Sequence, residues 1–438
     1  MSSARTRRPC ANGLRDRGRL RRQGPVMASS RSTAQMLTDL LAASHLATFE
    51  RLPPLVRHRA ALAGLDRVRI YLADLREETL REMTGEGLDA AREGEELPIE
   101  GTVAGRVFQS LQILPGSGED DGRRYWLPLL DGTERLGVLS ADLPQEPDDE
   151  TRSAMTALAS LVGLMVVSKR THSDSYARLT RSQPMSVSAE MQWTLMPPRT
   201  FAGPRVTVAA AMEPAYSTAG DAYDYALAGD VVHLAVFDAM GHDTAAGLTA
   251  NLAMATCRNQ RRQGASLTQA RDAIEAMLLE QFTLDRYATA VLADLDLRSG
   301  LLSWINCGHA PPILIRAGRW ITALDRPPTH PLGTDLGLPA EIHREQLEPG
   351  DRIVFYTDGI IEARDSSGRE FGLDRFLQFI IRHQADGFPV PETLRRLVRA
   401  VMDHHHGQLG DDATVLFCEW HGHEMPPLAE FLGPLART

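Results

Sequence analysis

The sequence predicts a mixed α/β protein with two folded units, because strand-like and helix-like segments follow one another in two different arrangements. Residues 55–170 combine several strand-like runs with one long apolar helix that closes the segment. From residue 204 onward, many strand-like runs surround two pairs of helices, which is typical of two layers of sheet with helices outside. A length of 438 residues agrees with two or three domains of about 150 residues each.

Composition and charge are those of a soluble globular protein, with 43% hydrophobic and 24% charged residues. The net charge of −10 argues against general nucleic-acid binding. The longest apolar stretch, residues 154–167, is shorter than the roughly 20 apolar residues of a membrane span, so we expect a buried helix there. Four cysteines lie far apart without metal-binding spacing, which favours reduced thiols and a cytoplasmic location.

The two ends of the chain are expected to lie outside the folded units. Residues 1–32 form a basic leader, and within its first 30 residues eight arginines accompany one acid, Asp16. This leader lacks the apolar stretch of a secretory signal. We expect it to be disordered, with Met27 as an alternative start, and a basic arm for anionic surfaces is the second interpretation. Residues 423–438 are expected to form a tail.

Residues 33–170 are expected to form the first folded unit. An amphipathic pattern predicts a helix over 33–45, and alternation of polar and apolar residues over 67–74 predicts a half-buried strand. Residues 125–139 have the pattern of a hairpin with an Asp-Gly turn. The acids at 148–150 suit the positive end of the apolar helix that follows them.

A connector over residues 171–203 joins this unit to the rest of the chain. It is polar at first, and residues 187–196 then show a weak helical period that ends at Pro197 and Pro198. We expect a helical linker that couples the two units. The segment is too short to be identified as a coiled coil.

The second unit is expected over residues 204–422. Its predicted strands cover residues 205–212, 231–238, 290–297, 301–306, 313–315, 352–357 and 414–419. Its predicted helices cover residues 244–263, 266–282, 373–383 and 391–405.

Four aspartates each lie just after, or at the end of, an apolar strand-like run and are the candidate functional residues: Asp221, Asp238, Asp358 and Asp411. Hard divalent cations prefer oxygen ligands, and a strand end is a rigid place for a carboxylate. The acids are scattered over about 190 residues, whereas those of a calcium loop fall within about 12. The sequence therefore predicts one metal centre that folding assembles.

Each motif alone also has a structural interpretation. The Gly-Asp-x-x-Asp motif at Asp221 and Asp224 is typical of a turn or cap, and the motif at Asp238 is compatible with a helix N-cap. Asp411 and Asp412 are adjacent, so within a strand their side chains would point to opposite faces and only one would bind metal. The Cys307 and His309 pair is interpreted as an interior turn rather than a catalytic thiol site.

Taken in order, the motifs of residues 204–420 resemble the sporulation protein E (SpoIIE) branch of the PPM metal-dependent protein phosphatases. The matching motifs are Gly-Asp-x-x-Asp, Asp238-x-x-Gly-His, Asn306-Cys-Gly-His-Ala-Pro-Pro312, Thr357-Asp-Gly-x-x-Glu-Ala-Arg364 and Asp411-Asp-Ala-Thr414. The resemblance implies an α/β sandwich of two antiparallel sheets flanked by helices. It also implies two Mn²⁺ or Mg²⁺ ions at one edge of the sandwich.

The resemblance assigns roles to individual residues. Asp221 and Asp238 would be the catalytic acids, with Asp238 bridging both ions and the carbonyl of Ala239 as a further ligand. Asp358 and Asp411 would complete the metal site. The sequence departs from the family at Asp243, where glycine is usual, and at Ala239, where some relatives have glycine.

The first unit, residues 33–170, resembles a GAF sensor domain in the order of its elements. The resemblance implies either a small ligand or dimerisation, and a packing domain without ligand is the alternative. A homodimer is therefore one of the oligomeric states left open.

The expected function is a metal-dependent serine/threonine protein phosphatase controlled by the N-terminal unit. Its expected substrate is a phosphorylated anti-sigma-factor antagonist, with neither nucleic acid nor membrane as a partner. The alternative is a catalytically quiet scaffold that binds a partner through the phosphatase fold.

Overall fold

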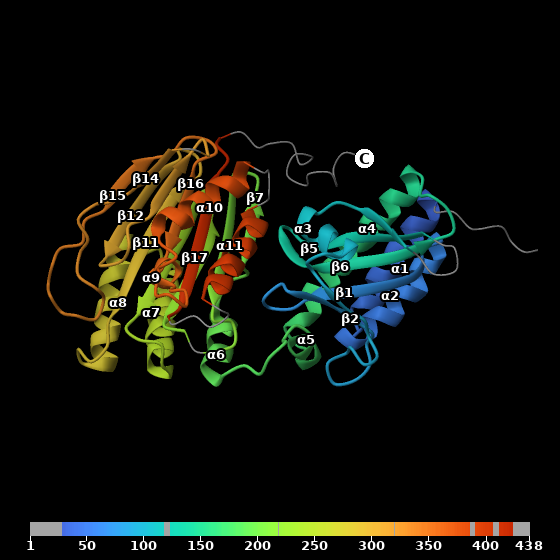
Figure 1. The fold of residues 1–438 in the computed structure, drawn as a ribbon, viewed down its shortest axis with the longest axis horizontal. Helices are drawn as coiled ribbons and strands as arrows, with labels where there is room; N and C mark the ends of the chain where they lie inside the picture. Colours follow the sequence, from blue (N-terminus) through green and yellow to red (C-terminus); the bar gives the residue numbers. More distant parts are fainter. Residues whose placement is uncertain are drawn as a thin grey trace, which may run out of the picture.

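The computed structural model describes residues 29–117, 123–217, 219–318, 320–385, 390–405 and 411–423. Most of the predicted leader and tail lie outside the described residues. The fold is mixed α/β with antiparallel sheets, as the sequence predicts (Figure 1).

An antiparallel six-stranded sheet forms the centre of the N-terminal unit, here defined as residues 30–179. Its strand order is β3-β2-β1-β6-β5-β4. The strands are β1 (Asp66–Ala73), β2 (Thr79–Met83), β3 (Glu96–Pro98), β4 (Leu114–Ser117), β5 (Arg123–Asp131) and β6 (Glu134–Leu143). The predicted hairpin is β5 and β6, and the resemblance of this unit to GAF domains stays a prediction.

Helices cover both faces of this sheet. The helices are α1 (Ser30–Ser44), α2 (Leu52–Ala60), α3 (Val103–Ser110), α4 (Asp149–Arg170) and α5 (Asp174–Leu179), with short 3-10 turns η1 (Phe49–Arg51) and η2 (Ala61–Ala63). Apolar side chains of α1, α2 and α4 pack against one face, and α3 packs against the other beside Tyr71 and Trp126. Within the described chain, α4 is the one helix long and apolar enough to cross a membrane, and half of that apolar window is buried inside the protein.

Two antiparallel sheets packed face to face form the C-terminal unit, here defined as residues 200–420. The first has the order β15-β12-β11-β10-β9 and the second the order β14-β13-β16-β17-β8-β7. The first contains β9 (Asp221–Ala228), β10 (Val231–Ala239), β11 (Ala288–Asp296), β12 (Leu301–Cys307) and β15 (His343–Gln346). The second contains β7 (Thr200–Gly203), β8 (Val206–Glu213), β13 (Ile313–Arg316), β14 (Trp320–Ala323), β16 (Arg352–Tyr356) and β17 (Ala413–Trp420).

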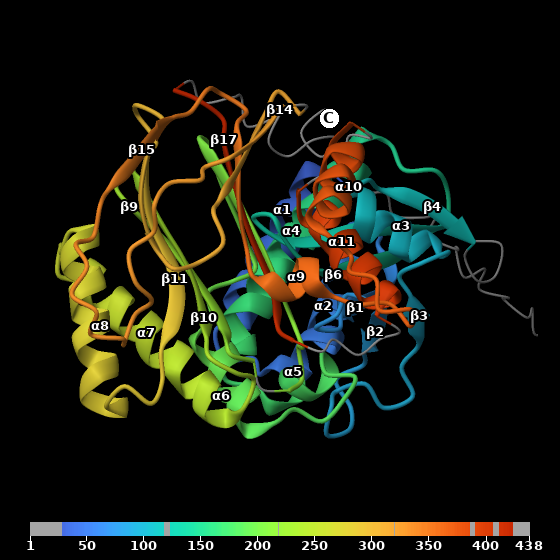
Figure 2. The same cartoon turned by 60° about the vertical axis from the view of Figure 1, so that its left-hand side comes forward.

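Helices lie outside both sheets and complete the sandwich that the sequence predicts (Figure 2). They are α7 (Thr244–Arg262) and α8 (Leu267–Phe282) on the first sheet, with α9 (Asp358–Glu362), α10 (Leu373–Ala385) and α11 (Val390–His404) on the second. The core between the sheets includes fully buried Val236 and Trp304 of the first and Phe355 and Leu416 of the second.

The connector contributes one helix to the C-terminal unit. This helix, α6 (Val187–Leu195), packs beside α7, and Pro197 and Pro198 follow it as predicted. The side chain of Ser186 caps its first turn by accepting from the N–H of Ala189.

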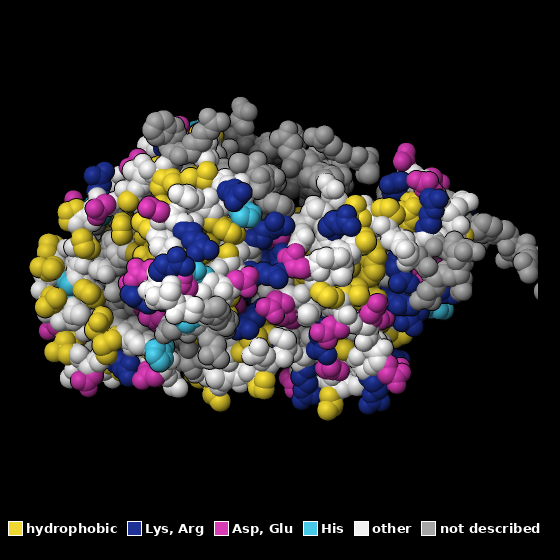
Figure 3. All heavy atoms as spheres, in the orientation of Figure 1, with side chains coloured by type: hydrophobic (Ala, Val, Ile, Leu, Met, Phe, Trp, Pro, Cys, Tyr) yellow, Lys and Arg dark blue, Asp and Glu magenta, His cyan; other side chains and the backbone are white. Residues whose placement is uncertain are grey.

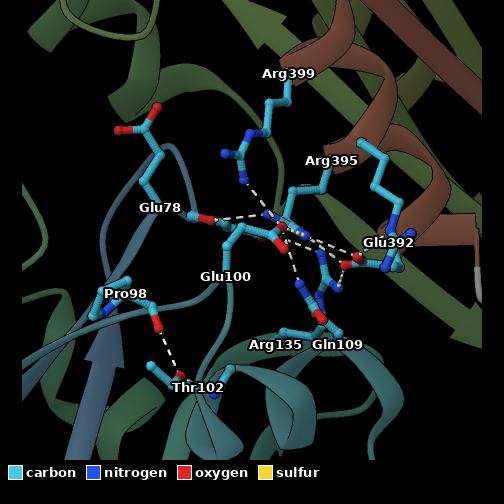
Figure 4. A network of polar contacts seen from close by, with 12 residues as sticks. Glu78, Pro98, Glu100, Thr102, Gln109, Arg135, Glu392, Arg395 and Arg399 are labelled. Atoms are coloured by element: carbon cyan, nitrogen blue, oxygen red, sulfur yellow. Dashed lines mark hydrogen bonds and ion pairs between the residues drawn. The ribbon is translucent and has the colours of Figure 1, made fainter.

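A buried network of ion pairs joins the two units (Figure 4). Arg135 of β6 donates to Glu392 of α11 at 2.6 Å, and the side chains are 4% and 0% exposed. Arg395 of α11 donates to Glu392 and, across the junction, to Glu100. In the space-filling view, basic and acidic side chains alternate over the middle of the molecule, where the units meet (Figure 3).

Candidate metal centre

Asp221 and Asp238 lie side by side on neighbouring strands. They are directly opposite in the register of β9 and β10, so their side chains leave the same face of the sheet. Asp221 is the first residue of β9 and is 2% exposed. This corrects one expectation, because Asp221 begins a strand instead of ending one.

The second sheet brings the other acids to the same end of the sandwich. Asp358 begins α9 directly after β16, and Asp411 precedes β17. The hydroxyl of Thr357 donates to Oδ2 of Asp221 at 2.7 Å and so connects the two sheets. Gly359 lies against the carbonyl oxygen of Asp412, where a Cβ would approach to 1.9 Å, so only glycine fits there.

Gly220 is the point where three of these motifs meet. A Cβ at this residue would lie 2.7 Å from the carbonyl oxygen of Ala239 and 2.3 Å from that of Gly241. The N–H of Gly220 donates to the carboxylate of Asp412, and its carbonyl accepts from the N–H of Ala239. The glycine therefore holds the Ala239 backbone beside Asp221.

The adjacent acids Asp411 and Asp412 are placed differently. Asp412 is 5% exposed and its carboxylate is used by Gly220, whereas Asp411 is exposed. The charge of Asp411 acts on both Asp238 and Asp358, whose pKa values it raises. The charge of Asp412 likewise raises the pKa of Asp221 and of Asp238, so the choice of Asp411 as the ligand stays a prediction.

The acids raise one another's pKa. Burial is the main cause at Asp221, Asp238, Asp358 and Asp412, and the neighbouring carboxylates add to it. For Asp412 the pKa rises to about 7. Like charges so close together favour a neutralising cation or a shared proton.

The donor set fits a hard divalent cation, because it consists of carboxylates and a backbone carbonyl. Within the ranges that the structure describes, no three His, Cys, Asp or Glu side chains are close enough to hold one ion together. The acids share one end of the sandwich, and their predicted roles as ligands stay predictions.

Asp224 lies outside this group. It is three residues from Asp221 on β9, so its side chain leaves the opposite face of the sheet. There it accepts from Arg258 at 2.6 Å and from Arg261 at 2.7 Å, both on α7. Asp224 therefore fixes α7 to β9.

Asp243, the departure from the family pattern, has a clear structural role. Its side chain caps α7 by accepting from the N–H of Ala246 at 2.7 Å. It also pairs with Arg286, which donates to the carbonyl of Met240 as well. Asp243 therefore stabilises the helix start, and Arg286, which the motifs did not reveal, contacts the loop that follows Asp238.

His309 is an interior residue, as expected for the turn over residues 306–312. Its ring lies between the sheets, with Nδ1 2.7 Å from the hydroxyl of Thr289 and Nε2 3.1 Å from the carbonyl of Tyr356. Burial lowers its pKa to about 4. Cys307 is buried, and burial raises its pKa to about 12, so the pair lacks the reactive thiolate of a cysteine nucleophile.

Sequence reasoning missed the side chains that orient the acids. Thr357 opens a matched motif but received no role there, and Gln192, whose amide donates to the backbone carbonyl of Asp221, lies in a weakly helical connector where nothing in the sequence marks it. A cavity of about 440 Å³ was also unforeseen; it lies at the junction of the two units, lined by Arg76, Arg135 and residues of β8 and α11. It contains none of the four predicted aspartates.

Comparison with known proteins agrees with the geometry of the C-terminal unit. Residues 228–421 match the family model of stage II sporulation protein E. This segment is a PPM-type domain of the SpoIIE branch. The SpoIIE-type domain thus includes Asp238, Ala239, Asp358 and Asp411, whereas Asp221 lies just before the matched segment.

The individual proteins that resemble this chain share only low sequence identity with it. Protein IcfG of Synechocystis is 26% identical over 132 residues, which cover 30% of this chain and 20% of that protein. The RsbU and RsbW domains of a Mycobacterium tuberculosis protein share 24% identity, covering 51% of this chain and 63% of theirs, with a TM-score of 0.45. The phosphatase domain and regulatory fragment of Bacillus subtilis SpoIIE share 16% identity, covering 70% and 82%, with a TM-score of 0.42. Similarity at this level assigns no activity to the chain.

Proposed function

We propose that the chain is a metal-dependent serine/threonine protein phosphatase whose reaction takes place at the acid cluster of the SpoIIE-type domain. The observation that supports this most is the opposition of Asp221 and Asp238 across β9 and β10, with Asp358 and Asp411 at the same end of the sandwich. Buried acids that raise one another's pKa are typical of functional sites.

The proposed ligands are Asp221, Asp238, the carbonyl of Ala239, Asp358 and Asp411, and the proposed cofactor is a pair of Mn²⁺ or Mg²⁺ ions. When bound, such a pair lowers the pKa of a water molecule and neutralises charge on the phosphate oxygens. Asp221 and Asp238 are the proposed catalytic acids because they lie closest together in the sheet register.

The chain's own residues prepare this chemistry by fixing where the carboxylates lie. Thr357 donates to Oδ2 of Asp221 and so fixes the orientation of that carboxylate. Gly220 lets the Ala239 backbone approach Asp221. Asp412, whose carboxylate already accepts from the N–H of Gly220, serves to position this backbone rather than to bind the cation.

The proposed substrate is phosphoserine or phosphothreonine on a regulatory protein, and the proposed partner is a phosphorylated anti-sigma-factor antagonist. The N-terminal unit is the proposed sensor, through a small ligand or through dimerisation. Buried ion pairs between Arg135, Glu392 and Arg395 support control of this kind, because they join the two units directly.

A catalytically quiet scaffold is the second candidate function. It would keep the sandwich and the partner surface while using the acids only for folding. The mutual rise in pKa of the buried acids disfavours this function, because a purely structural role would favour pairing with arginine, as at Asp224.

The direct test is release of phosphate from a phosphoserine peptide by the full chain, measured with and without Mn²⁺. We expect Mn²⁺-dependent hydrolysis that Asp238→Asn reduces by at least about 100-fold, since a neutral amide would replace a proposed ligand carboxylate. Asp325→Asn is the matched control, because Asp325 is an exposed aspartate of the same domain. Equal rates for the wild-type chain and Asp238→Asn would favour the scaffold.

A further inference from the structure

The cavity of about 440 Å³ at the junction of the two units has no part in the proposed reaction. Its floor is the outer face of β8, which carries Ala209, Ala211 and Glu213 because side chains alternate along a strand. The two alanines have little bulk and leave room between β8 and the N-terminal unit. Small-molecule sites occupy about 300–1,000 Å³ and occur preferentially where domains meet, so the cavity has the size and place of such a site.

The walls of the cavity come from both units. Leu394, Val398 and Met402 of α11 line one side, and their spacing of four residues puts them on one face of the helix. The loop of residues 75–78 and the side chain of Arg135 line the side that the N-terminal unit supplies. The helix therefore offers an apolar stripe, whereas most of the polar groups come from elsewhere in the lining.

Two guanidinium groups of the lining act on one buried carboxylate. Arg76 of the N-terminal unit lies 3.5 Å from Glu213, which is 5% exposed. Arg199 is held beside β8, because its carbonyl accepts from the N–H of Ala210 at 2.7 Å. Burial raises the pKa of Glu213, and the charges of Arg76 and Arg199 oppose this rise. Two positive charges therefore share one negative charge at this end of the cavity.

Arg199 is the guanidinium without a carboxylate partner. Its side chain lies over the ring of Trp193, 5.2 Å from the centroid, and within the ranges that the structure describes it forms no ion pair. The aromatic ring fixes the plane of the guanidinium without neutralising its charge. A positive charge in a partly enclosed site favours an anion as its partner.

The other charges of the lining do not offset this surplus. An ion-pair network matches three arginines of the lining with three glutamates: Arg135, Arg395, Arg399, Glu77, Glu100 and Glu392. The remaining acids of the lining, Glu78 and Asp403, are exposed, so water screens them. In the close-up view, the carboxylate of Glu78 points away from the network (Figure 4).

We propose that the cavity binds a small amphipathic anion, with its carboxylate or phosphate group at Arg199 and Arg76 and its apolar body along the stripe of α11. A guanidinium donates two parallel hydrogen bonds to either kind of anion. A ligand in this position contacts both units at once. The site goes beyond the proposed function, because its lining contains none of the four predicted aspartates.

The test is calorimetric titration of the full chain with three probes that share an eight-carbon chain: octanoate, octyl phosphate and 1-octanol. Chelator is present throughout, so that no phosphate binds through a cation at the acid cluster and the result does not depend on the proposed function. We expect one site per chain for octanoate, octyl phosphate or both, at least about tenfold tighter than for 1-octanol, since a charge-assisted hydrogen bond is lost with the alcohol. Binding of neither anion overturns the proposal, and so does equal affinity for 1-octanol.

Arg199→Gln tests the residue that is proposed to hold the anion. Glutamine keeps a long polar side chain and removes the charge, so the affinity for the bound anion should fall at least about tenfold. Arg298→Gln is the matched control, because Arg298 belongs to the same domain, lies outside the lining and has 76% of its side chain exposed. Its affinity should stay within about twofold of wild type. Unchanged affinity in a folded Arg199→Gln, or an equal loss in Arg298→Gln, overturns the proposal.

Hydrogen exchange of the wild-type chain locates the bound anion without any variant, and it decides if Arg199→Gln does not fold. Addition of the anion that binds should slow exchange in residues 75–78 and 394–402, which line the cavity from the two units. Slower exchange elsewhere with no change in these two segments would place the anion at another site and overturn the proposal.

Discussion

The hydroxyl of Thr357 donates to the carboxylate of Asp221 at 2.7 Å and accepts from the backbone N–H of Thr414 at 2.9 Å. Thr357 follows β16 in one sheet, and Asp221 begins β9 in the other. One fully buried hydroxyl thus fixes the orientation of an acid that the opposite sheet supplies. Orientation of a metal-binding carboxylate by a hydrogen bond is a general feature of metal sites.

Replacing Thr357 by valine should weaken Mn²⁺ binding and phosphatase activity by about 10- to 100-fold. Valine has nearly the same shape but cannot donate to Asp221, so the carboxylate loses its fixed orientation. Calorimetric titration with Mn²⁺ measures the effect. Thr357→Ser keeps the hydroxyl and should retain most of the affinity; a serine variant as weak as the valine variant would show that the methyl group matters instead.

The junction of the two units should depend strongly on Glu392. Burial alone raises the pKa of Glu392, but hydrogen bonds from Arg395 and the charge of Arg135 outweigh this effect and hold the pKa at about 2. Glu392→Ala would leave these arginines buried without their shared partner. We expect the free energy of unfolding, measured with urea, to fall by about 3–5 kcal/mol.

The control for Glu392 is an ion pair at the surface. Arg123 and Glu146 lie 3.2 Å apart with 59% and 68% of their side chains exposed. Glu146→Ala should leave the urea midpoint unchanged, because water screens exposed pairs. An equally small change in Glu392→Ala would show that the network does not hold the two units together.

His309 should make stability depend on pH. Burial lowers its pKa from 6.5 to about 4, so the folded chain keeps the ring neutral while the unfolded chain takes up a proton. Between pH 6.5 and pH 4 the unfolded state therefore binds more protons, and stability falls as the pH falls. The loss reaches about 3 kcal/mol at pH 4.

The comparison that isolates this contribution is His309→Gln, because glutamine does not titrate. Urea unfolding of the wild-type chain and the variant at pH 7, 5.5 and 4.5 should show a steeper loss in the wild-type chain. The same slope in both chains would mean that His309 is protonated in the folded state.

The cysteines should be dispensable for activity. Burial raises the pKa of Cys257 and of Cys307 to about 12, and it raises the pKa of buried Cys418 as well. Iodoacetamide at pH 7.5 should therefore leave the phosphatase activity of the folded chain unchanged. The experiment uses a Cys10→Ser chain, and mass spectrometry counts the cysteines that iodoacetamide has labelled. Loss of phosphatase activity in step with labelling of Cys307 would favour a thiol mechanism.

The long apolar runs made most strands and helices predictable. The strand that ends at Asp238, the strand before Asp358 and the helices after residues 243 and 265 lie where the pattern places them. Strand β9 was not predicted, because its aspartates at 221 and 224 hide the apolar pattern and aspartate is rare in strands. Both faces of β9 are buried, one toward the acid cluster and the other against arginines of α7, so the usual alternation is missing.

Contacts between distant segments had no local signal. Arg135 and Glu392 are 257 residues apart, and nothing near either residue in the sequence indicates its partner. The same is true of Gln192, whose role depends on how α6 packs beside the backbone before Asp221. Asp238 and Asp358 could be singled out because their motifs lie at the ends of apolar strands, whereas the side chains that orient the acids became visible only in the folded structure.

The central claim is that acids from both sheets bind divalent cations together, and a Mn²⁺ titration followed by electron paramagnetic resonance tests it most directly. The account predicts two bound ions per wild-type chain and the loss of at least one of them in Asp238→Asn, with Asp325→Asn unchanged. A wild-type chain that binds no Mn²⁺, or an Asp238→Asn chain that binds as many ions as the wild type, would contradict it.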